Sequence, residues 1–480
     1  CSITNINNES IEYIDSENHQ LIYKAEGNAN MILSLSDKKS NQNLNVNNEK
    51  KILRLRKVCK EQHTIDQINE LKQLKRFIAY AKLINILFEQ ENFFRSPKLA
   101  FLNVVDLHEF NTNLNKYRPV DRLDKEIRTT FGIIYPDVTF LPFDNRSNNV
   151  YCIEIKPKQG WTFYDNNNIC DDLDDTLIDF EMQKCRYCLS QYLKLKKKKI
   201  DKVSKYCPLD LFSGKPFRML QAIKGLIGSP QNNFKLIKNG NIVYKNGLEK
   251  SVFNKMLKEI FITSKTKEER KTIFMNLLRE ALLRDFTIDC DPPSDCKVLT
   301  MRKDRRKKDR NQIHERNCQI FERNSLPRNS VLHRLLDNQL LVKSNFSHMQ
   351  NELVTSRALQ EHDEYEYIDE LVQKYNHQNQ CTKDQLLNSL NHKEKYFFGA
   401  TSLDCSIMIT FRRISDYELN NFSRELINRH TIFINGMKFL VNVTIIDLDS
   451  KTSKHFNKYL QQMRASQLAY QEFLAKLNRK

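Results

Sequence analysis

Apolar and polar positions alternate along several segments of the chain, and this alternation predicts β-strands. Residues 21–35 have the pattern of a strand, a turn of small residues and a second strand, while 52–57 alternates apolar with basic residues. Arg54 and Arg56 would therefore share one face of their strand. Further strands are expected at 99–105, 132–141, 406–412 and 438–446.

Other segments repeat their apolar residues with the period of an α-helix. The clearest is 68–91, where Leu71, Leu74 and Ile78 recur on one face. Residues 1–20 are polar and rich in Asn, and we expect them to fray. Helices are also expected at 182–199, 217–227, 255–285, 330–342, 355–378 and 456–477.

The segment 150–161 joins a β-branched strand to the sequence Glu-Ile-Lys-Pro-Lys. In an extended chain residues two apart share a face, so Glu154, Lys156 and Lys158 would project together. Pro157 ends pairing within a sheet. We expect the segment to bring an acid and two ammonium groups to one place; a solvated edge strand is the alternative interpretation.

Two further apolar strands have carboxylates at their ends. The strand at 438–446 is followed by Asp447 and Asp449, which would lie on one face and could hold Mg²⁺ with nucleotide phosphates. An acid pair at the start of a helix is the alternative. Asp404 precedes the strand at 406–412, where it could serve as a general base for an attacking hydroxyl or cap a turn.

Three polar residues recur at every fourth position after these acids. They are Lys451, His455 and Tyr459. If a helix begins there, they lie on roughly one face. Unrelated surface side chains are the alternative.

Cysteine usage is typical of a reducing compartment. The twelve cysteines lack the regular spacing of a disulfide framework. Cys185 and Cys188 form a C-x-x-C pair inside a predicted helix, but no second pair follows. Because zinc needs about four ligands, we interpret the pair as helix packing. His333, in an apolar helix pattern, is expected to be structural.

The composition indicates a soluble protein with a polyanionic partner. The 480 residues, 40% of them hydrophobic, suffice for two or three domains. The formal charge of +18 favours nucleic acid, anionic lipid or a phosphorylated small molecule. No apolar run approaches the roughly 20 residues that span a bilayer. We expect an intracellular protein, in the cytoplasm, the nucleus or both.

Glycine-rich nucleotide motifs are absent from the sequence. It contains neither G-x-x-x-x-G-K-[ST] nor G-x-G-x-x-G, and has only ten glycines. The turn within 21–35 beside the basic strand 52–57 resembles the way kinase-like N-lobes hold ATP phosphates, although a hairpin with a basic outer face has the same pattern. Asp137 lies where a lobe-connecting segment could fall.

Two basic runs suggest an alternative function. The runs at 196–199 and 301–310 lack interleaved aromatic residues, which argues against single-stranded nucleic acid, and such runs are usually solvated. The alternative is a non-catalytic scaffold that binds RNA or anionic lipid through them.

Several motifs follow one another in order from about residue 20 to about residue 460. They are E-G-x-x-N at 26–30, E-x-K-P-K as Glu154, Ile155, Lys156, Pro157 and Lys158, Y-x-P-L-D-L-F-S-G at 206–214, P-Q-N-N-F at 230–234, D-C-S-I-M-I at 404–409 and I-D-L-x-x-K at 446–451. Together they resemble the inositol-pentakisphosphate 2-kinase family.

The resemblance implies an α+β, two-lobed, kinase-like fold. After a flexible 1–20, residues 21–137 would form a small β-rich N-lobe, and 138–480 a larger α/β C-lobe with a helical inositide-binding region. The implied reaction moves the γ-phosphoryl group of ATP, with Mg²⁺, to the 2-hydroxyl of inositol 1,3,4,5,6-pentakisphosphate and gives the hexakisphosphate, phytate. The five phosphates carry roughly −8 to −10 near pH 7, which requires a pocket crowded with cations. A monomer is expected, with nucleic acid as a secondary partner.

The family pattern also implies residue roles. Lys156 would meet the transferring phosphoryl group, Asp404 would orient or deprotonate the hydroxyl, and Asp447 would hold Mg²⁺. The ATP site would consist of Gly27, Asn30, Arg54 and Asp137. The substrate would contact Arg118, Lys156, Lys158, Lys194, Asn232, Asp404, Lys451, His455 and Tyr459.

The sequence departs from the family pattern at a few positions. His455 stands where Arg is expected, so its phosphate contact would be weaker or pH-dependent. Leu403 replaces an expected Lys, and Cys59 a basic residue of some relatives. Plant relatives have a zinc site with a C-x-x-C before the segment at 404, whereas 351–399 contains only Cys381 here, so we do not transfer that zinc site.

Overall fold

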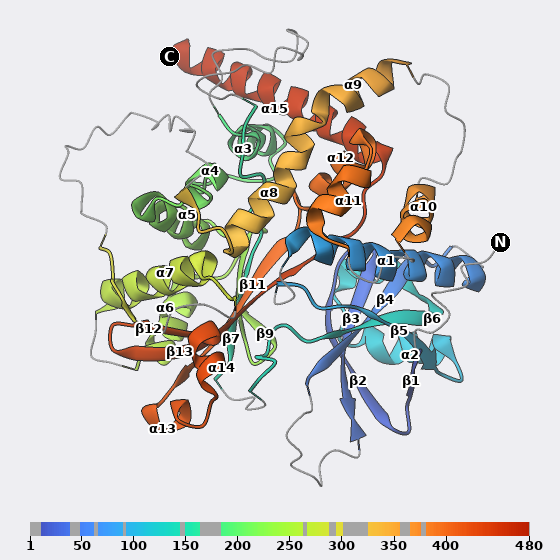
Figure 1. Cartoon of the computed structure of the whole chain (residues 1–480), viewed down its shortest axis with the longest axis horizontal. Helices are drawn as coiled ribbons and strands as arrows, with labels where there is room; N and C mark the ends of the chain where they lie inside the picture. Colours follow the sequence, from blue (N-terminus) through green and yellow to red (C-terminus); the bar gives the residue numbers. More distant parts are fainter. Residues whose placement is uncertain are drawn as a thin grey trace. The chain divides into compact units, whose positions relative to one another are not determined.

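Helices and two sheets make up two compact units, and the chain is of the α+β class, as predicted (Figure 1). Unit 1 comprises residues 1–150 and 365–383, and unit 2 comprises 151–364 and 384–480. The computed structural model describes residues 11–38, 49–61, 66–89, 93–144, 149–163, 184–262, 266–287, 294–300, 325–355, 365–375 and 381–479. The basic run at 301–310 lies outside these ranges.

Unit 1 is built on a sheet whose described strands follow the order β1-β5-β6-β4-β3-β2. The pair β1–β5 is parallel, and the other neighbours are antiparallel. The strands are β1 (Glu12–Asp15), β2 (His19–Glu26), β3 (Asn30–Asp37), β4 (Lys51–Cys59), β5 (Lys98–Asn103) and β6 (Lys125–Pro136). The hairpin predicted at 21–35 and the strand at 52–57 are thus confirmed.

Two expectations for unit 1 are wrong. Residues 1–20 do not fray throughout, because Glu12–Asp15 pair with β5. The strand predicted at 132–141 begins at Lys125 and ends at Pro136. Its first half is polar, so the apolar pattern missed it, but backbone pairing with β4 extends it.

The helices of unit 1 are α1 (Gln67–Phe88), α2 (Leu107–Asn115), the short 3-10 helix η3 (Val120–Arg122) and α10 (Glu366–Tyr375). Asp66 caps α1 by accepting from the backbone amides of the first turn. Arg76 of α1 donates two hydrogen bonds, of 2.8 and 2.5 Å, to Asp369 of α10. This bidentate pair joins helices that lie far apart in the sequence.

Unit 2 is built on a second sheet, whose described strands follow the order β10-β12-β13-β11-β7-β8-β9. They are β7 (Tyr151–Ile155), β8 (Phe234–Lys238), β9 (Asn241–Tyr244), β10 (Asp295–Cys296), β11 (Ser406–Ile414), β12 (Thr431–Ile434) and β13 (Met437–Ile446). All five residues of β7 are buried. Because β7 pairs with β8 on one side and β11 on the other, the edge-strand interpretation of this segment is wrong.

The register of these strands creates the site. β7 runs antiparallel to β11, and β11 runs antiparallel to β13. Ile155 therefore lies beside Ile407, and Ser406 lies beside Ile446. The end of β7, the start of β11 and the end of β13 consequently meet at one edge of the sheet.

Most of the described helices belong to unit 2. They are α3 (Arg186–Lys196), α4 (Pro208–Leu211), α5 (Pro216–Gly228), α6 (Lys250–Ile260), α7 (Lys267–Leu283), α8 (Val331–Ser344), α9 (Phe346–Thr355), α11 (Lys383–Ser389, whose first residue belongs to unit 1), α12 (His392–Thr401), α13 (Asp416–Leu419), α14 (Arg424–His430) and α15 (Ser453–Asn478). The helix predicted at 255–285 is two helices, α6 and α7. Of the helix predicted at 355–378, residues 356–364 and 376–378 lie outside the described residues.

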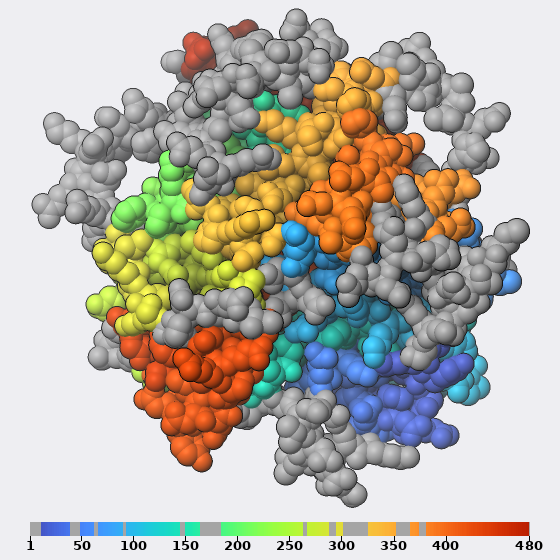
Figure 2. All heavy atoms as spheres, in the orientation of Figure 1, coloured from blue at the N-terminus to red at the C-terminus, as the bar shows by residue number. Residues whose placement is uncertain are grey.

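Close helix packing explains one glycine of unit 2. The atoms of α8 and α12 lie side by side in the space-filling view (Figure 2). A Cβ on Gly399 of α12 would lie 2.8 Å from the backbone nitrogen of Val342 in α8. Only glycine permits this approach without displacing a backbone.

Among the described helices, none is long and apolar enough to cross a lipid bilayer.

Candidate active site

Two lysines and two carboxylates meet where β7, β11 and β13 end or begin. Lys156 Nζ lies 3.2 Å from Asp447 Oδ2, and Lys158 Nζ lies 2.6 Å from Asp404 Oδ1. The residues are up to 291 positions apart in the chain. The structure therefore brings together all three residues that the sequence predicted to be catalytic, with Lys158 beside them.

The backbone at this site differs from the extended chain that the sequence suggested. β7 ends at Ile155, and Lys158 has a left-handed φ of 61°. Asp447, directly after β13, has a φ of 64°. The prediction that alternation places these groups on common strand faces is wrong, because the strands stop first. The convergence comes from strand register, and the left-handed turns point to strain held at a functional site.

Glu154 is the buried acid behind these groups. Its carboxylate accepts from Lys235 Nζ at 2.6 Å. Ser406 Oγ lies 3.4 Å from Glu154 and 3.1 Å from Asp447, so its single proton can be donated to either carboxylate. Glu154 thus bonds side chains of β8 and β11, and its charge helps to keep Lys156 protonated.

Gln339 of α8 holds the segment that carries Lys158. Its Nε2 lies 3.0 Å from the carbonyl oxygens of Lys158 and Ser402, and its Oε1 accepts from the Gly160 amide at 2.8 Å. Tyr206 adds a bond of 2.6 Å from its hydroxyl to the Pro157 carbonyl. Sequence reasoning missed Gln339; its only signal was a polar residue among apolar positions of a helix.

Charge at the site shifts two pKa values. Burial alone would lower the pKa of Lys156, but the carboxylates of Asp447, Asp404 and Glu154 outweigh it and raise that pKa. Burial alone would raise the pKa of Asp404, yet Lys158, Lys156 and Lys451 outweigh it and lower that pKa. At neutral pH the first group is therefore a cation and the second an anion.

Lys194 lies on α3, beside the same cluster. Burial, and then the charges of Lys158 and Lys199, lower its pKa. Among the described residues, no carboxylate forms a salt bridge with its ammonium group. A cation that is partly buried and faces other cations favours an anionic ligand.

The amide-bearing loop before β8 contributes Asn233 in addition to the predicted Asn232. Asn232 is exposed. Its neighbour Asn233 is buried, accepts the Lys156 backbone amide at 3.0 Å through its carbonyl, and donates to the Tyr187 hydroxyl at 3.0 Å. Asn233 positions the lysine segment, whereas Asn232 is open to a ligand.

The predicted row of Lys451, His455 and Tyr459 is only partly helical. α15 begins at Ser453, so Lys451 precedes it. Tyr459 is buried and donates to Gln159 Oε1 at 2.8 Å. This tyrosine thus contacts the lysine segment, two residues after Pro157, from within the core.

His455 is a neutral side chain near the cluster. Burial, followed by the charges of Lys451 and Arg186, lowers the pKa of His455 to about 4. Its Nδ1 lies 3.2 Å from the Tyr396 hydroxyl. At neutral pH it offers a hydrogen bond and no charge; that its phosphate contact is weaker than that of arginine stays a prediction.

Unit 1 holds the residues predicted to bind ATP. Gly27 lies in the turn between β2 and β3, and its amide donates to the Asn30 carbonyl at 2.9 Å. When the side-chain amide oxygen of Asn30 faces Arg54, it accepts a hydrogen bond of 2.8 Å from the Arg54 guanidinium. This guanidinium lies over the Phe77 ring. The structure therefore groups Asn30 and Arg54 on neighbouring strands at the turn.

Arg118 occupies a different environment from the predicted substrate contact. Its buried guanidinium bonds both carboxylate oxygens of Glu26 at 3.0 Å. Lys57 pairs with the same carboxylate, and the two cations lower the pKa of Glu26 although burial alone would raise it. In this conformation Arg118 braces the end of β2, while Arg122 is more exposed.

Asp137 lies away from the turn of the ATP-binding prediction. Its carboxylate pairs with Lys24 and accepts from Thr139 Oγ1 at 2.6 Å. Its backbone amide donates to the carbonyl oxygen of Lys50, just before β4. The turn at Gly27 lies near Arg56, toward the other end of β4. Six residue steps along the strand, roughly 20 Å, separate Lys50 from Arg56.

The carboxylates after β13 fit a hard divalent cation. The Asp447 side chain is 48% exposed, and Lys156 and Ser406 both bond its Oδ2 atom. Mg²⁺ commonly takes one or two carboxylate oxygens and completes its shell with phosphate and water. Asp447 would hold such an ion, with the half-buried Asp449 close behind.

Comparison with known proteins decides the family. The sequence model of the inositol-pentakisphosphate 2-kinase family matches residues 23–465. The chain belongs to this family. It is similar to the inositol-pentakisphosphate 2-kinase of Drosophila melanogaster, with 29% identity over 348 residues that cover 56% of this chain and 55% of the relative.

Further relatives come from other animals and from plants. The inositol-pentakisphosphate 2-kinase of Danio rerio is 32% identical over 201 residues, 40% of each chain. That of Arabidopsis thaliana is 37% identical over 95 residues, 19% of each chain. The chain thus spans about half, or less, of the length of the curated relatives it matches.

Within this inositol-pentakisphosphate 2-kinase family member, all the listed motifs except E-G-x-x-N at 26–30 lie in unit 2. The motif from Glu154 to Lys158 spans the end of β7, the motif at 404–409 spans the start of β11, and the motif at 446–451 starts at the last residue of β13. The Tyr206 motif supplies the hydroxyl that binds Pro157. Motifs that are distant in the sequence are therefore parts of one structural cluster.

Proposed function

We propose that the chain catalyses transfer of the γ-phosphoryl group of ATP to the 2-hydroxyl of inositol 1,3,4,5,6-pentakisphosphate, giving inositol hexakisphosphate. The observation that carries the proposal is the convergence of Lys156, Lys158, Asp404 and Asp447 at one sheet edge, in a chain of this family. Phosphoryl transfer depends mainly on positioning and charge neutralisation. Paired cations and acids supply both.

Each group has a role that follows from its charge. Lys156, kept protonated by three carboxylates, neutralises charge on the transferring phosphoryl group. Asp404, kept ionised by lysines, orients the 2-hydroxyl and accepts its proton. A carboxylate with a lowered pKa is a weak base, so orientation is its larger contribution. Asp447 would hold Mg²⁺, which would supply further neutralisation of phosphate charge.

The substrate phosphates would bind the cations around this cluster. Lys158, Lys194 and Lys451 supply charge, while Asn232 and His455 supply hydrogen bonds. The buried Tyr459 acts through Gln159. Arg118 would act indirectly, because its guanidinium holds the Glu26 carboxylate at the end of β2 in unit 1.

The two units would correspond to the lobes of a kinase-like fold. Unit 1 contains the turn at Gly27 with Asn30 and Arg54, proposed to bind the ATP phosphates. Asp137 marks the other end of β4, where the lobe-connecting segment would begin. We propose the N-lobe as 21–137 and the C-lobe as 138–480.

The decisive experiment is incubation of the protein with ATP, Mg²⁺ and the pentakisphosphate, followed by chromatography of the products. Lys156→Ala and Asp447→Asn should each lower kcat by a factor of about 10²–10³, because each removes transition-state charge stabilisation. Lys255→Ala, on an exposed residue of α6, is the matched control and should retain full activity. Hexakisphosphate formation that survives both site changes would refute the assignment.

The alternative, a scaffold that binds RNA or lipid through basic runs, gains no support from the described residues. In the run at 196–199, Lys196 pairs with Glu472 of α15 at 2.7 Å. The same incubation distinguishes the two functions, since a scaffold would bind polyanions and release no ADP.

A further inference from the structure

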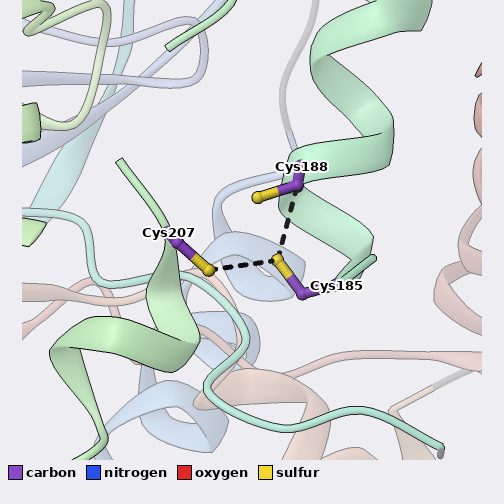
Figure 3. A group of neighbouring side chains, drawn as sticks. All are labelled: Cys185, Cys188 and Cys207. Atoms are coloured by element: carbon purple, nitrogen blue, oxygen red, sulfur yellow. Dashed lines mark hydrogen bonds between the residues drawn. The ribbon is translucent and has the colours of Figure 1, made fainter. Parts of the chain in front are cut away.

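Three cysteines of unit 2 have their sulfur atoms close together. The Sγ atoms of Cys185, Cys188 and Cys207 all lie within 4.8 Å of one another, and those of Cys185 and Cys207 are 3.9 Å apart. Figure 3 shows the three side chains turned toward one another from two separate segments. Cys185 and Cys207 are buried, and Cys188 is half-buried. The sequence displayed only the C-x-x-C pair, because Cys207 lies beyond the helix.

Local structure explains the arrangement. Cys185 is the N-cap of α3 rather than a residue within the helix, and its Sγ accepts from the Cys188 amide at 3.4 Å. The first turn thereby directs both side chains to the same side. Cys207 immediately precedes Pro208, the first residue of α4.

The separation of the sulfur atoms matches a metal site better than a disulfide. A disulfide requires about 2.05 Å between sulfurs. In a tetrahedral zinc site with Zn–S bonds of about 2.3 Å, the sulfurs lie roughly 3.8 Å apart. Packing alone would need no thiol at three adjoining positions, since apolar side chains fill such space equally well.

We propose that Cys185, Cys188 and Cys207 form a thiolate site for a soft d¹⁰ metal ion, zinc(II) above all. Soft thiolate ligands select zinc or copper(I) over magnesium. Zinc takes four ligands, and where the protein supplies three, water takes the fourth position. Each thiol that binds the ion releases its proton to solvent, and the released protons balance the charge. No electron is transferred, so the ion keeps its oxidation state.

The site would stabilise the scaffold around the lysine segment. Tyr206, next to Cys207, donates to the Pro157 carbonyl at 2.6 Å. Tyr187, between Cys185 and Cys188, accepts from Asn233, whose carbonyl receives the Lys156 amide. A metal ion would tie both tyrosines together. It would take no part in phosphoryl transfer.

The test uses cobalt(II) as a spectroscopic probe for zinc. The full chain is reduced, treated with chelator and titrated with cobalt(II). We expect sulfur-to-cobalt charge-transfer absorption that saturates at one ion per chain and disappears when one equivalent of zinc(II) is added. Cys207→Ser should abolish most of that absorption, whereas Cys59→Ser, on an exposed cysteine of β4, should leave it unchanged.

A second measurement needs no variant, which matters because Cys207→Ser could fail to fold. Alkylation by iodoacetamide, mapped by mass spectrometry, should slow at least tenfold for Cys188 when zinc(II) is present and stay constant for Cys59. If only copper(I) protects Cys188, the site stands with copper as its ion. No thiolate absorption and no protection by either ion would overturn the proposal, as would a Cys185–Cys207 disulfide in the isolated protein. None of these readouts depends on kinase activity.

Discussion

The lysines of unit 2 that would bind phosphate differ in whether a carboxylate neutralises them. Lys156 and Lys158 are neutralised by Asp447 and Asp404, which keep them in place before a ligand arrives. Lys194 forms no such pair among the described residues, and burial lowers its pKa. A bound phosphate would compensate that burial. We therefore expect Lys194 to contribute more to ligand affinity than to stability.

The neutral state of His455 predicts a pH dependence of stability. Its pKa is about 4 in the folded chain and near 6.5 when exposed. A depressed pKa means that the unfolded chain binds a proton first, so stability present above 6.5 is lost as pH falls toward 4. Between about pH 7 and pH 5 this loss should reach roughly 1–2 kcal/mol.

Chemical unfolding at both pH values tests this prediction. His455→Gln should remove most of that difference, because glutamine keeps a polar group beside Tyr396 and cannot titrate. His108→Gln, on an exposed histidine of α2, is the control and should follow the wild type. Equal pH dependence in all three proteins would contradict the low pKa of His455.

We predict that Gln339 contributes both to stability and to catalysis. Gln339→Leu fills a similar volume but leaves the Gly160 amide and the Lys158 and Ser402 carbonyls without this partner. We expect a loss of roughly 3 kcal/mol in unfolding free energy. Lys158 should also be misplaced, so kcat should fall about tenfold or more well below the melting temperature.

Steady-state kinetics at low temperature, where the variant is folded, provide the measurement. Gln20→Leu, on an exposed residue of β2, is the matched control and should change neither property. A Gln339 variant that melts earlier but keeps its kcat would show that the residue is purely structural.

At the scale of elements, α5 supports the segment that carries Tyr206 and Cys207. A Cβ on Gly225 would lie 2.8 Å from the Lys205 carbonyl carbon and the Tyr206 backbone nitrogen. Backbone atoms cannot rotate away as a flexible side chain can. Gly228, three residues later in the same helix, has nothing within 4 Å of the corresponding position.

These two glycines form a matched pair for one substitution. Gly225→Ala should destabilise the protein by about 1–3 kcal/mol and reduce activity, because it displaces the segment that binds Pro157. Gly228→Ala should be neutral or stabilising by up to about 1 kcal/mol. Thermal melting and turnover of both variants check this, and similar effects of the two changes would argue against the close packing of α5.

The elements of the site were predictable from the sequence to different degrees. The strands before Asp447 and after Asp404 are β-branched and apolar, so local patterning located both. The position of β7 between β8 and β11 depends on its pairing with residues of β11 that lie some 250 positions later in the chain. No local sequence pattern encodes such a distant pairing. Asn233, Gln339 and Cys207 were missed for the same reason, since each acts through a distant backbone or side chain.

At the scale of the whole molecule, the proposed function divides ligand binding between the units. The residues proposed for the ATP phosphates around the turn at Gly27 lie in unit 1, and most of those proposed for the inositide lie in unit 2. Unit 2 also supplies Lys156 and Asp447, which would meet the transferring phosphoryl group and Mg²⁺. The formal charge of +18 raises the affinity for both ligands through long-range attraction. Specific affinity should still depend on which unit supplies the contact, because screening limits that attraction to about 8 Å at physiological salt.

Ligand-induced thermal shifts test this division. A ligand at 100 times its Kd stabilises the folded chain by about 2.7 kcal/mol, so each ligand should raise the Tm measurably. Arg54→Ala should lose much of the shift caused by a non-hydrolysable ATP analogue with Mg²⁺ and retain the shift caused by the pentakisphosphate. Lys158→Ala should show the reverse, while Lys255→Ala should retain both.

The pattern of losses distinguishes specific sites from general attraction. If +18 alone drew both anions, removing any one cation would weaken both shifts slightly and equally, and the exposed Lys255 would count as much as Lys158. A site predicts instead that one substitution removes one shift. Added salt should reduce the pentakisphosphate shift more than the nucleotide shift, because the inositide carries more charge than the nucleotide with its bound Mg²⁺.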